Sequence, residues 1–151
     1  MTTAANLVKL VLVALCALLA AVSVSARPAA RASYNWDAPT NVIALDHNNF
    51  NGKTGKGMWL VMFYARWCSN SKRFAPTFDT AATALVSLRK QASPLFLGRV
   101  DCDANEALCD RFKIDGYPTV FRFENGDIRE EYEGDRSERD LLGYLRTKYG
   151  Q

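Results

Sequence analysis

An unbroken apolar run at residues 58–65 constrains the fold more than any other feature of this sequence. At eight residues, with aromatic and branched aliphatic side chains, the run predicts a β-strand that is buried on both faces.

The segments around this run alternate between strand and helix patterns. Further strands are expected at 41–45, 94–100, 119–124 and 128–132, and helices after Asp46, from Phe74 onward, at 105–112 and at 137–149. The pair Asn125 and Gly126, between the last two strands, is a hairpin signal. Alternation that ends in a hairpin predicts an α/β domain with a central mixed β-sheet flanked by helices on both faces.

The N-terminus has the layout of a secretory signal peptide. An apolar stretch of 15 residues, 10–24, follows Lys9 and precedes small residues up to Ala26. The stretch is short for a membrane span of roughly 20 residues, so a cleaved signal is favoured over an uncleaved signal anchor. We therefore expect a signal peptide at 1–26, a linker at 27–40 and a folded domain at 41–151, with no membrane attachment unless the signal stays uncleaved.

Charge and composition exclude several classes of function. There are 19 Lys and Arg against 16 Asp and Glu, and this net charge of +3 is too small and scattered for a nucleic-acid-binding protein. His47 is the single histidine, which excludes sites with two or three His ligands, and we expect no metal and no resident cofactor. After loss of Cys16 with the signal, three cysteines remain, and an odd number in an oxidising compartment suggests a free reactive thiol or an intermolecular pair.

Cys68 lies where the buried strand ends and a helix begins. The N–H groups of the first helical turn and the nearby Lys72 and Arg73 favour an anion there, so the pKa of this thiol should be lowered. The alternative is a structural cysteine. Such a residue usually lies among apolar neighbours, whereas polar and basic residues follow Cys68.

The chain resembles the thioredoxin superfamily and, within it, the catalytic domains of protein disulfide isomerases. Five segments carry the resemblance in order and spacing: F-Y-A-R-W-C at 63–68, F-A-P at 74–76, V-D-C-D at 100–103, G-Y-P-T at 116–119 and Y-E-G-D-R at 132–136. The resemblance implies a thioredoxin fold over about residues 41–149.

The resemblance also implies roles for individual residues. Pro118 would be cis and lie beside Cys68, where it offers backbone groups to an extended client peptide. Trp67, Tyr117 and Phe63 would form an apolar lip around Cys68 that suits an unfolded client. The alternative is that they are core residues, which is the better interpretation for Phe63. Thr119 is a further candidate substrate-binding residue. Arg136 matches an arginine that assists the second cysteine of the family, and a solvated surface charge is the alternative interpretation.

The sequence departs from the family at the second redox cysteine, where it has Ser71. A hydroxyl cannot resolve a mixed disulfide, although it can donate a hydrogen bond to the Cys68 thiolate. The family's buried carboxylate is replaced by Met62, its proline before the tryptophan by Arg66, and its histidine by Asn70. Without that histidine, the pKa of Cys68 should be lowered less than in a complete isomerase site.

Cys102 and Cys109 occupy a context in which isomerase domains carry a cysteine pair. The resemblance implies a structural disulfide, which would be compatible with an oxidising lumen. Two free buried thiols are the alternative, because sequence alone does not show the Cα separation that a disulfide needs.

Taken together, these features predict a protein disulfide isomerase-like protein of the endoplasmic reticulum lumen, or a secreted one. It would assist folding by forming mixed disulfides with unfolded or thiol-bearing clients at Cys68, with weak or no dithiol oxidase activity and with glutathione as a candidate exchange thiol. One alternative is a non-catalytic module that tethers clients, or a second copy of itself, through Cys68. Another is a glutathione-linked monothiol reductase.

Overall fold

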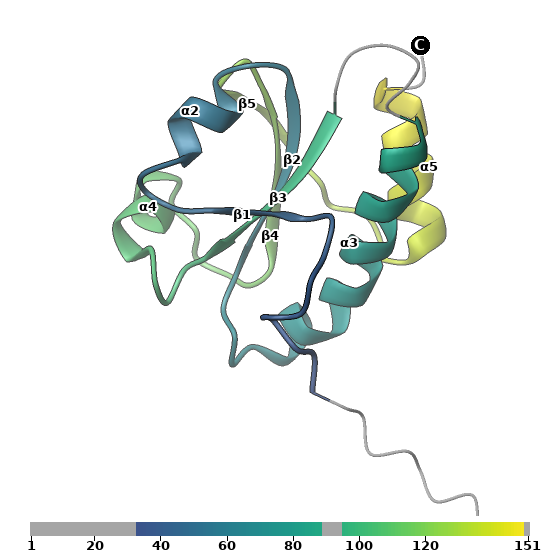
Figure 1. Cartoon of the computed structure of the whole chain (residues 1–151). Coiled ribbons are helices and arrows are strands. Elements are labelled where there is room, and N and C mark those ends of the chain that lie inside the picture. Colours follow the sequence, from purple (N-terminus) through teal and green to yellow (C-terminus); the bar gives the residue numbers. More distant parts are fainter. Residues whose placement is uncertain (1–32, 89–94, 150–151) are drawn as a thin grey trace, which may run out of the picture. The chain divides into compact units, whose positions relative to one another are not determined.

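The computed structural model describes residues 33–88 and 95–149 (Figure 1). The predicted signal peptide at 1–26 and the start of the predicted linker lie outside the described residues. Within the described ranges, no helix combines the length and apolar character needed to cross a membrane.

The strands form one mixed sheet, as predicted. They are β1 (Ile43–Leu45), β2 (Met58–Tyr64), β3 (Leu95–Asp101), β4 (Thr119–Glu124) and β5 (Asp127–Glu131). Their order in the sheet is β1-β3-β2-β4-β5, in which β1, β3 and β2 are parallel to one another and β4 and β5 are antiparallel additions. The apolar run therefore occupies the central strand, and every residue from Trp59 to Tyr64 is buried.

Helices cover both faces of this sheet. They are α2 (Phe50–Thr54), α3 (Ser69–Leu88), α4 (Glu106–Arg111) and α5 (Glu138–Tyr149). Figure 1 shows α2 and α4 on one face and α3 and α5 on the other. Each layer has its own apolar core, with Phe50 and Leu108 in the first and Phe78 and Leu141 in the second. The predicted arrangement is confirmed.

The hairpin between β4 and β5 has the predicted turn. Asn125 and Gly126 have φ angles of 52° and 91°, and two positive φ values match the tight turn that joins twisted strands. The Asn125 side chain also accepts a hydrogen bond of 3.0 Å from the backbone N–H of Gly57, which fastens this turn to the loop before β2.

The folded unit begins earlier than the sequence predicted. Trp36 is 6% exposed, its ring stacks on Tyr64 at a centroid distance of 3.9 Å, and its carbonyl accepts a 2.8 Å hydrogen bond from Arg99. The expected linker at 27–40 is therefore wrong for its C-terminal part, since the domain includes residues from 33 onward. The periodicity of this segment is too weak to predict packing that depends on partners in β2 and β3.

Candidate active site

Cys68 lies at the junction between β2 and α3. Its N–H donates to the carbonyl of Ala65 at 3.1 Å, and its own carbonyl accepts the N–H of Lys72 at 3.1 Å. The thiol is half-buried and is the free cysteine of the described chain. The predicted placement at a helix N-terminus is confirmed.

The surroundings of Cys68 favour its ionised form. Burial raises the pKa of the thiol, but the N–H of Ser71, the Ser71 hydroxyl, the N–H of Asn70 and the charge of Arg136 lower it more, so the pKa lies below its ordinary value. In the protonated form, Sγ donates to the carbonyl of Tyr117 at 3.3 Å. The thiol therefore has a partner in each ionisation state.

Ser71 is fully buried, and its hydroxyl oxygen has no hydrogen-bond partner among the described residues. An unpartnered buried hydroxyl costs roughly 1–3 kcal/mol. The same hydroxyl is among the groups that lower the pKa of Cys68, because it stabilises the thiolate. Ser71 thus belongs to the site through its effect on the Cys68 thiolate, and it adds no second thiol.

The loop before β4 supplies the opposite wall of the site. The Tyr117–Pro118 peptide bond is cis, as the resemblance implied, and Pro118 is buried. Thr119 begins β4, and its hydroxyl donates to the carbonyl of Gly116 at 2.9 Å, which closes the loop on itself. Through the bond between Tyr117 and Cys68, the loop is held against the thiol.

Arg136 reaches the same loop from the segment before α5. Its guanidinium donates to the carbonyl of Pro118 at 3.0 Å and lies 6.0 Å from the ring centre of Phe74. These contacts and its effect on the pKa of Cys68 place Arg136 at the site. The role of its side chain in the chemistry stays a prediction.

Trp67 forms an exposed aromatic wall next to Cys68. It is 67% exposed, yet its indole N–H donates to Asp103 at 3.1 Å and its ring meets that of Tyr117 edge-to-face at 6.0 Å. Phe63 is fully buried in the core. Trp67 and Tyr117 therefore form the aromatic edge of the site without Phe63. Asp103 was not predicted, because nothing local in the sequence relates it to a tryptophan 36 residues away.

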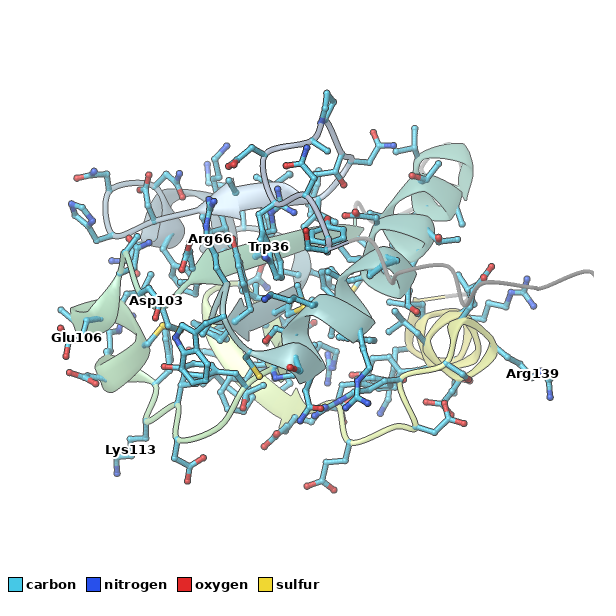
Figure 2. All side chains as sticks on the ribbon, turned by 90° about the horizontal axis from the view of Figure 1, so that it is seen from below. Trp36, Arg66, Asp103, Glu106, Lys113 and Arg139 are labelled. Carbon is cyan, nitrogen blue, oxygen red and sulfur yellow. A yellow bond between two sulfur atoms is a disulfide. The ribbon has the colours of Figure 1, made fainter. Side chains whose placement is uncertain are left out.

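Arg66 fastens the turn that carries Trp67 and Cys68. Its guanidinium pairs with Asp101 at the end of β3 at 2.7 Å and with Asp37 at 3.1 Å. Figure 2 shows Arg66 and Trp36 on the same side of the molecule. The sequence marks Arg66 as a departure from the resembled family but predicts no partner for it, because Asp37 falls within the predicted linker.

Cys102 and Cys109 form a disulfide with a Cα–Cα distance of 5.8 Å. It joins the residue after β3 to α4, and both cysteines are buried. The structure thus decides between the two alternatives in favour of the disulfide. Among the described residues, no group of three or more His, Cys, Asp or Glu side chains is placed to hold a metal ion.

A comparison with protein families identifies the family of this chain. The Thioredoxin family model matches residues 41–147. This chain is a member of the thioredoxin family. In human ERp44 (crystal form I), a thioredoxin-fold region superposes with a TM-score of 0.69 at 31% identity, which covers 74% of this chain and 30% of that one. The J-Trx1 fragment of ERdj5 superposes with a TM-score of 0.65 at 28% identity, covering 74% of this chain and 53% of the fragment.

Curated relatives of this thioredoxin domain are disulfide isomerases by name. Protein disulfide isomerase-like 2-2 of Oryza sativa subsp. japonica is 33% identical over 112 residues, which is 73% of this chain and 29% of that protein. Protein disulfide-isomerase 1 of Caenorhabditis elegans is 35% identical over 111 residues, or 73% of this chain and 22% of that protein. The chain thus spans less than a third of either relative, and the similarity covers its thioredoxin domain.

Two of the departures noted in the sequence are buried in the structure. Met62, where the resemblance places a buried carboxylate, is 1% exposed and belongs to an apolar core. Ser71, where the resemblance places the second cysteine, is fully buried. A buried carboxylate is costly where it has no proton to transfer. Its absence is consistent with the absence of a second thiol.

Proposed function

We propose that this thioredoxin domain performs thiol–disulfide exchange with client proteins through Cys68 alone, in the lumen of the endoplasmic reticulum or outside the cell. The observation that carries the proposal is the half-buried Cys68 thiol with a lowered pKa, paired with a buried serine in place of a resolving thiol. The secretory location rests on the signal-like N-terminus.

The proposed reaction is an exchange without net oxidation. The Cys68 thiolate attacks one sulfur of a client disulfide, so that a Cys68–client disulfide forms and the second client sulfur leaves as a thiolate. Another client thiolate, or glutathione, then attacks the mixed disulfide and releases Cys68 as a thiolate. Ser71 stabilises the Cys68 thiolate at the start and at the end, and Arg136 holds the loop that the client would meet.

Refolding of scrambled ribonuclease in a glutathione buffer tests this function. The wild type should accelerate the recovery of ribonuclease activity, whereas Cys68→Ser should match the buffer alone. Equal inactivity of both proteins would contradict isomerisation.

A second candidate function is covalent tethering of clients, which is favoured by the serine at the resolving position. If the mixed disulfide is cleared slowly, the protein retains clients instead of turning over. Non-reducing electrophoresis should then show client complexes that are lost in Cys68→Ser and on reduction. A constitutive dimer that disappears in the same variant would indicate self-tethering, and removal of glutathione from a glutathionylated protein would indicate a reductase.

A further inference from the structure

We propose that the site selects clients with a basic residue close to the reacting cysteine, and that an aromatic–acidic patch beside Cys68 binds this side chain. The patch consists of the residues Trp67, Tyr117, Asp103, Glu106 and Asp110. This inference rests on the proposed exchange function and specifies which clients it prefers.

The aromatic half of the patch is exposed but held in place. Trp67 is the most exposed large hydrophobic residue of the described chain, and it immediately precedes the nucleophile. The Asp103 carboxylate accepts its indole N–H, and Tyr117 meets its ring edge-to-face. Asp103 is in turn held by its own N–H, which donates to Asp101. A preformed aromatic surface costs little entropy on binding and attracts cations through the ring face.

The acidic half of the patch lies on or next to α4. Burial raises the pKa of the Tyr117 hydroxyl, and the carboxylates of Asp103, Asp110 and Glu106 raise it further, so all three act on the same ring. These carboxylates are exposed on or next to α4. A guanidinium or ammonium group on the aromatic surface would therefore meet several negative charges.

Basic residues near the patch only partly offset this charge. Between residues 103 and 117 the sequence has four acidic and two basic side chains. Arg111 is engaged elsewhere, because it bonds to Asn51 at 2.9 Å and lies over the ring of Phe112 at 4.9 Å. Lys113 is exposed, and Figure 2 shows it on the α4 side, below Glu106.

Basic residues also lie near Cys68, in α3 and in the segment before α5. Arg136 contributes a positive potential at Cys68, and Lys72 and Arg73 lie in the first turns of α3. In Figure 2, Asp103 and Glu106 lie on the α4 side, whereas Arg139 lies on the α5 side.

The reacting sulfur fixes where the client cysteine docks. The client sulfur has to meet Cys68 Sγ, which donates to the carbonyl of Tyr117 and lies just before α3. Because Trp67 precedes Cys68 and Tyr117 bonds to it, the residues beside the client cysteine lie within reach of the aromatic–acidic patch.

Peptides with an activated cysteine test this preference. Each peptide carries thionitrobenzoate on its single cysteine and has Arg or Glu two residues before or two residues after it. Attack by the Cys68 thiolate forms a Cys68–peptide disulfide and releases coloured thionitrobenzoate, with no net oxidation. At one of these two positions, before or after the cysteine, the Arg peptide should react with a rate constant about fivefold higher than that of the Glu peptide at low salt. Added salt should reduce this ratio.

Matched variants assign the preference to the patch. Asp103→Asn with Glu106→Gln should bring the Arg-to-Glu ratio close to one, and Asn can still accept the Trp67 indole N–H. Asp127→Asn with Glu131→Gln removes the same charges from β5 and should leave the ratio unchanged. The ratio cancels any general loss of reactivity.

Three outcomes would overturn the inference. Equal rates for the Arg and Glu peptides at both positions would show that the site does not distinguish the charge beside the client cysteine, while the exchange function would remain intact. A ratio that survives in the Asp103 and Glu106 variant would exclude this patch. A wild type that reacts no faster than Cys68→Ser with every peptide would overturn the proposed function as well.

Discussion

At the scale of single residues, the site is defined by the relation between one thiol and one hydroxyl. Cys68 has the position and the lowered pKa of a nucleophile, and Ser71 is buried beside it without a partner among the described residues. The hydroxyl can stabilise a thiolate but cannot attack a disulfide, because its own pKa is far too high. In the proposed exchange, a single atom, oxygen in place of sulfur, thus separates capture of a client from its release.

Substitution of Ser71 by Ala should raise the pKa of Cys68, because the thiolate loses a hydrogen-bond donor. The thiolate fraction at neutral pH then falls, while each remaining thiolate becomes somewhat more nucleophilic, so alkylation by iodoacetamide should slow about three- to fivefold. The measurement is the alkylation rate against pH, whose midpoint should move upward. An unchanged midpoint would show that the hydroxyl does not act on the sulfur.

Substitution of Ser71 by Cys should add the missing resolving thiol. Mixed disulfides with a peptide should then decay into free peptide and an internal disulfide between Cys68 and the introduced cysteine, and mass spectrometry should show the loss of two hydrogens from the protein. Proton transfer remains unassisted because Met62 occupies the carboxylate position. Persistence of the peptide adduct, as in the wild type, would place residue 71 out of reach of the mixed disulfide.

At the scale of elements, Glu130 joins the outer hairpin to the last helix. On β5, its carboxylate accepts hydrogen bonds from Arg122 of β4 at 3.0 Å and from Tyr144 of α5 at 2.7 Å. Lys148, also on α5, adds an ion pair at 3.0 Å. The Tyr144 hydrogen bond, opposed by partial burial and helped by Lys148 and Arg122, lowers the pKa of Glu130 to about 2.

Substitution of Glu130 by Gln should therefore destabilise the protein in a pH-dependent way. Because the folded pKa of about 2 lies below the ordinary 4.5, the stabilisation is complete above pH 4.5 and is lost as the pH falls toward 2. For a partly exposed group, the loss at neutral pH should be about 1 kcal/mol. Urea unfolding at several pH values measures it. The neighbouring exposed Glu131→Gln is the control, and a constant difference between wild type and Glu130→Gln at all pH values would contradict the assignment.

At the scale of the whole molecule, the N-terminal residues of the domain close one side of the core and support the active-site turn. Trp36 packs on Tyr64 at the end of β2, and Asp37 pairs with Arg66 two residues before Cys68. Tyr34 and Thr40 both bond to Asp79 on α3. A segment without regular secondary structure therefore links the sheet, the long helix and the site.

Substitution of Trp36 by Ala should cost about 3 kcal/mol of unfolding free energy, because a large buried ring leaves a cavity. Trp67→Ala is the matched control, since the same change at a 67% exposed position should cost far less. Urea unfolding of both variants gives the comparison. Similar losses for the two would mean that Trp36 does not belong to the core.

Much of the fold could be predicted because its signals are local. The buried length of β2, the Asn-Gly turn and the helical spacing after Cys68 each depend on a few neighbouring residues, and the structure has all three. Most element ends differ by one or two residues, as at β1 and β5, where the last backbone bonds depend on the partner strand. The start of α3 differs more, since the helix begins at Ser69, before the apolar spacing that starts at Phe74.

The sequence by itself determined the chemistry that is available: one nucleophilic cysteine at a helix N-terminus and no second thiol within its motif. Only the tertiary structure decided what surrounds that cysteine. The Asp103 bond to Trp67, the Arg66 pair with Asp37 and the burial of Trp36 all join segments that lie at least 28 residues apart. Periodicity and turn preferences act over a few residues, whereas such contacts exist only once the sheet has brought distant segments together.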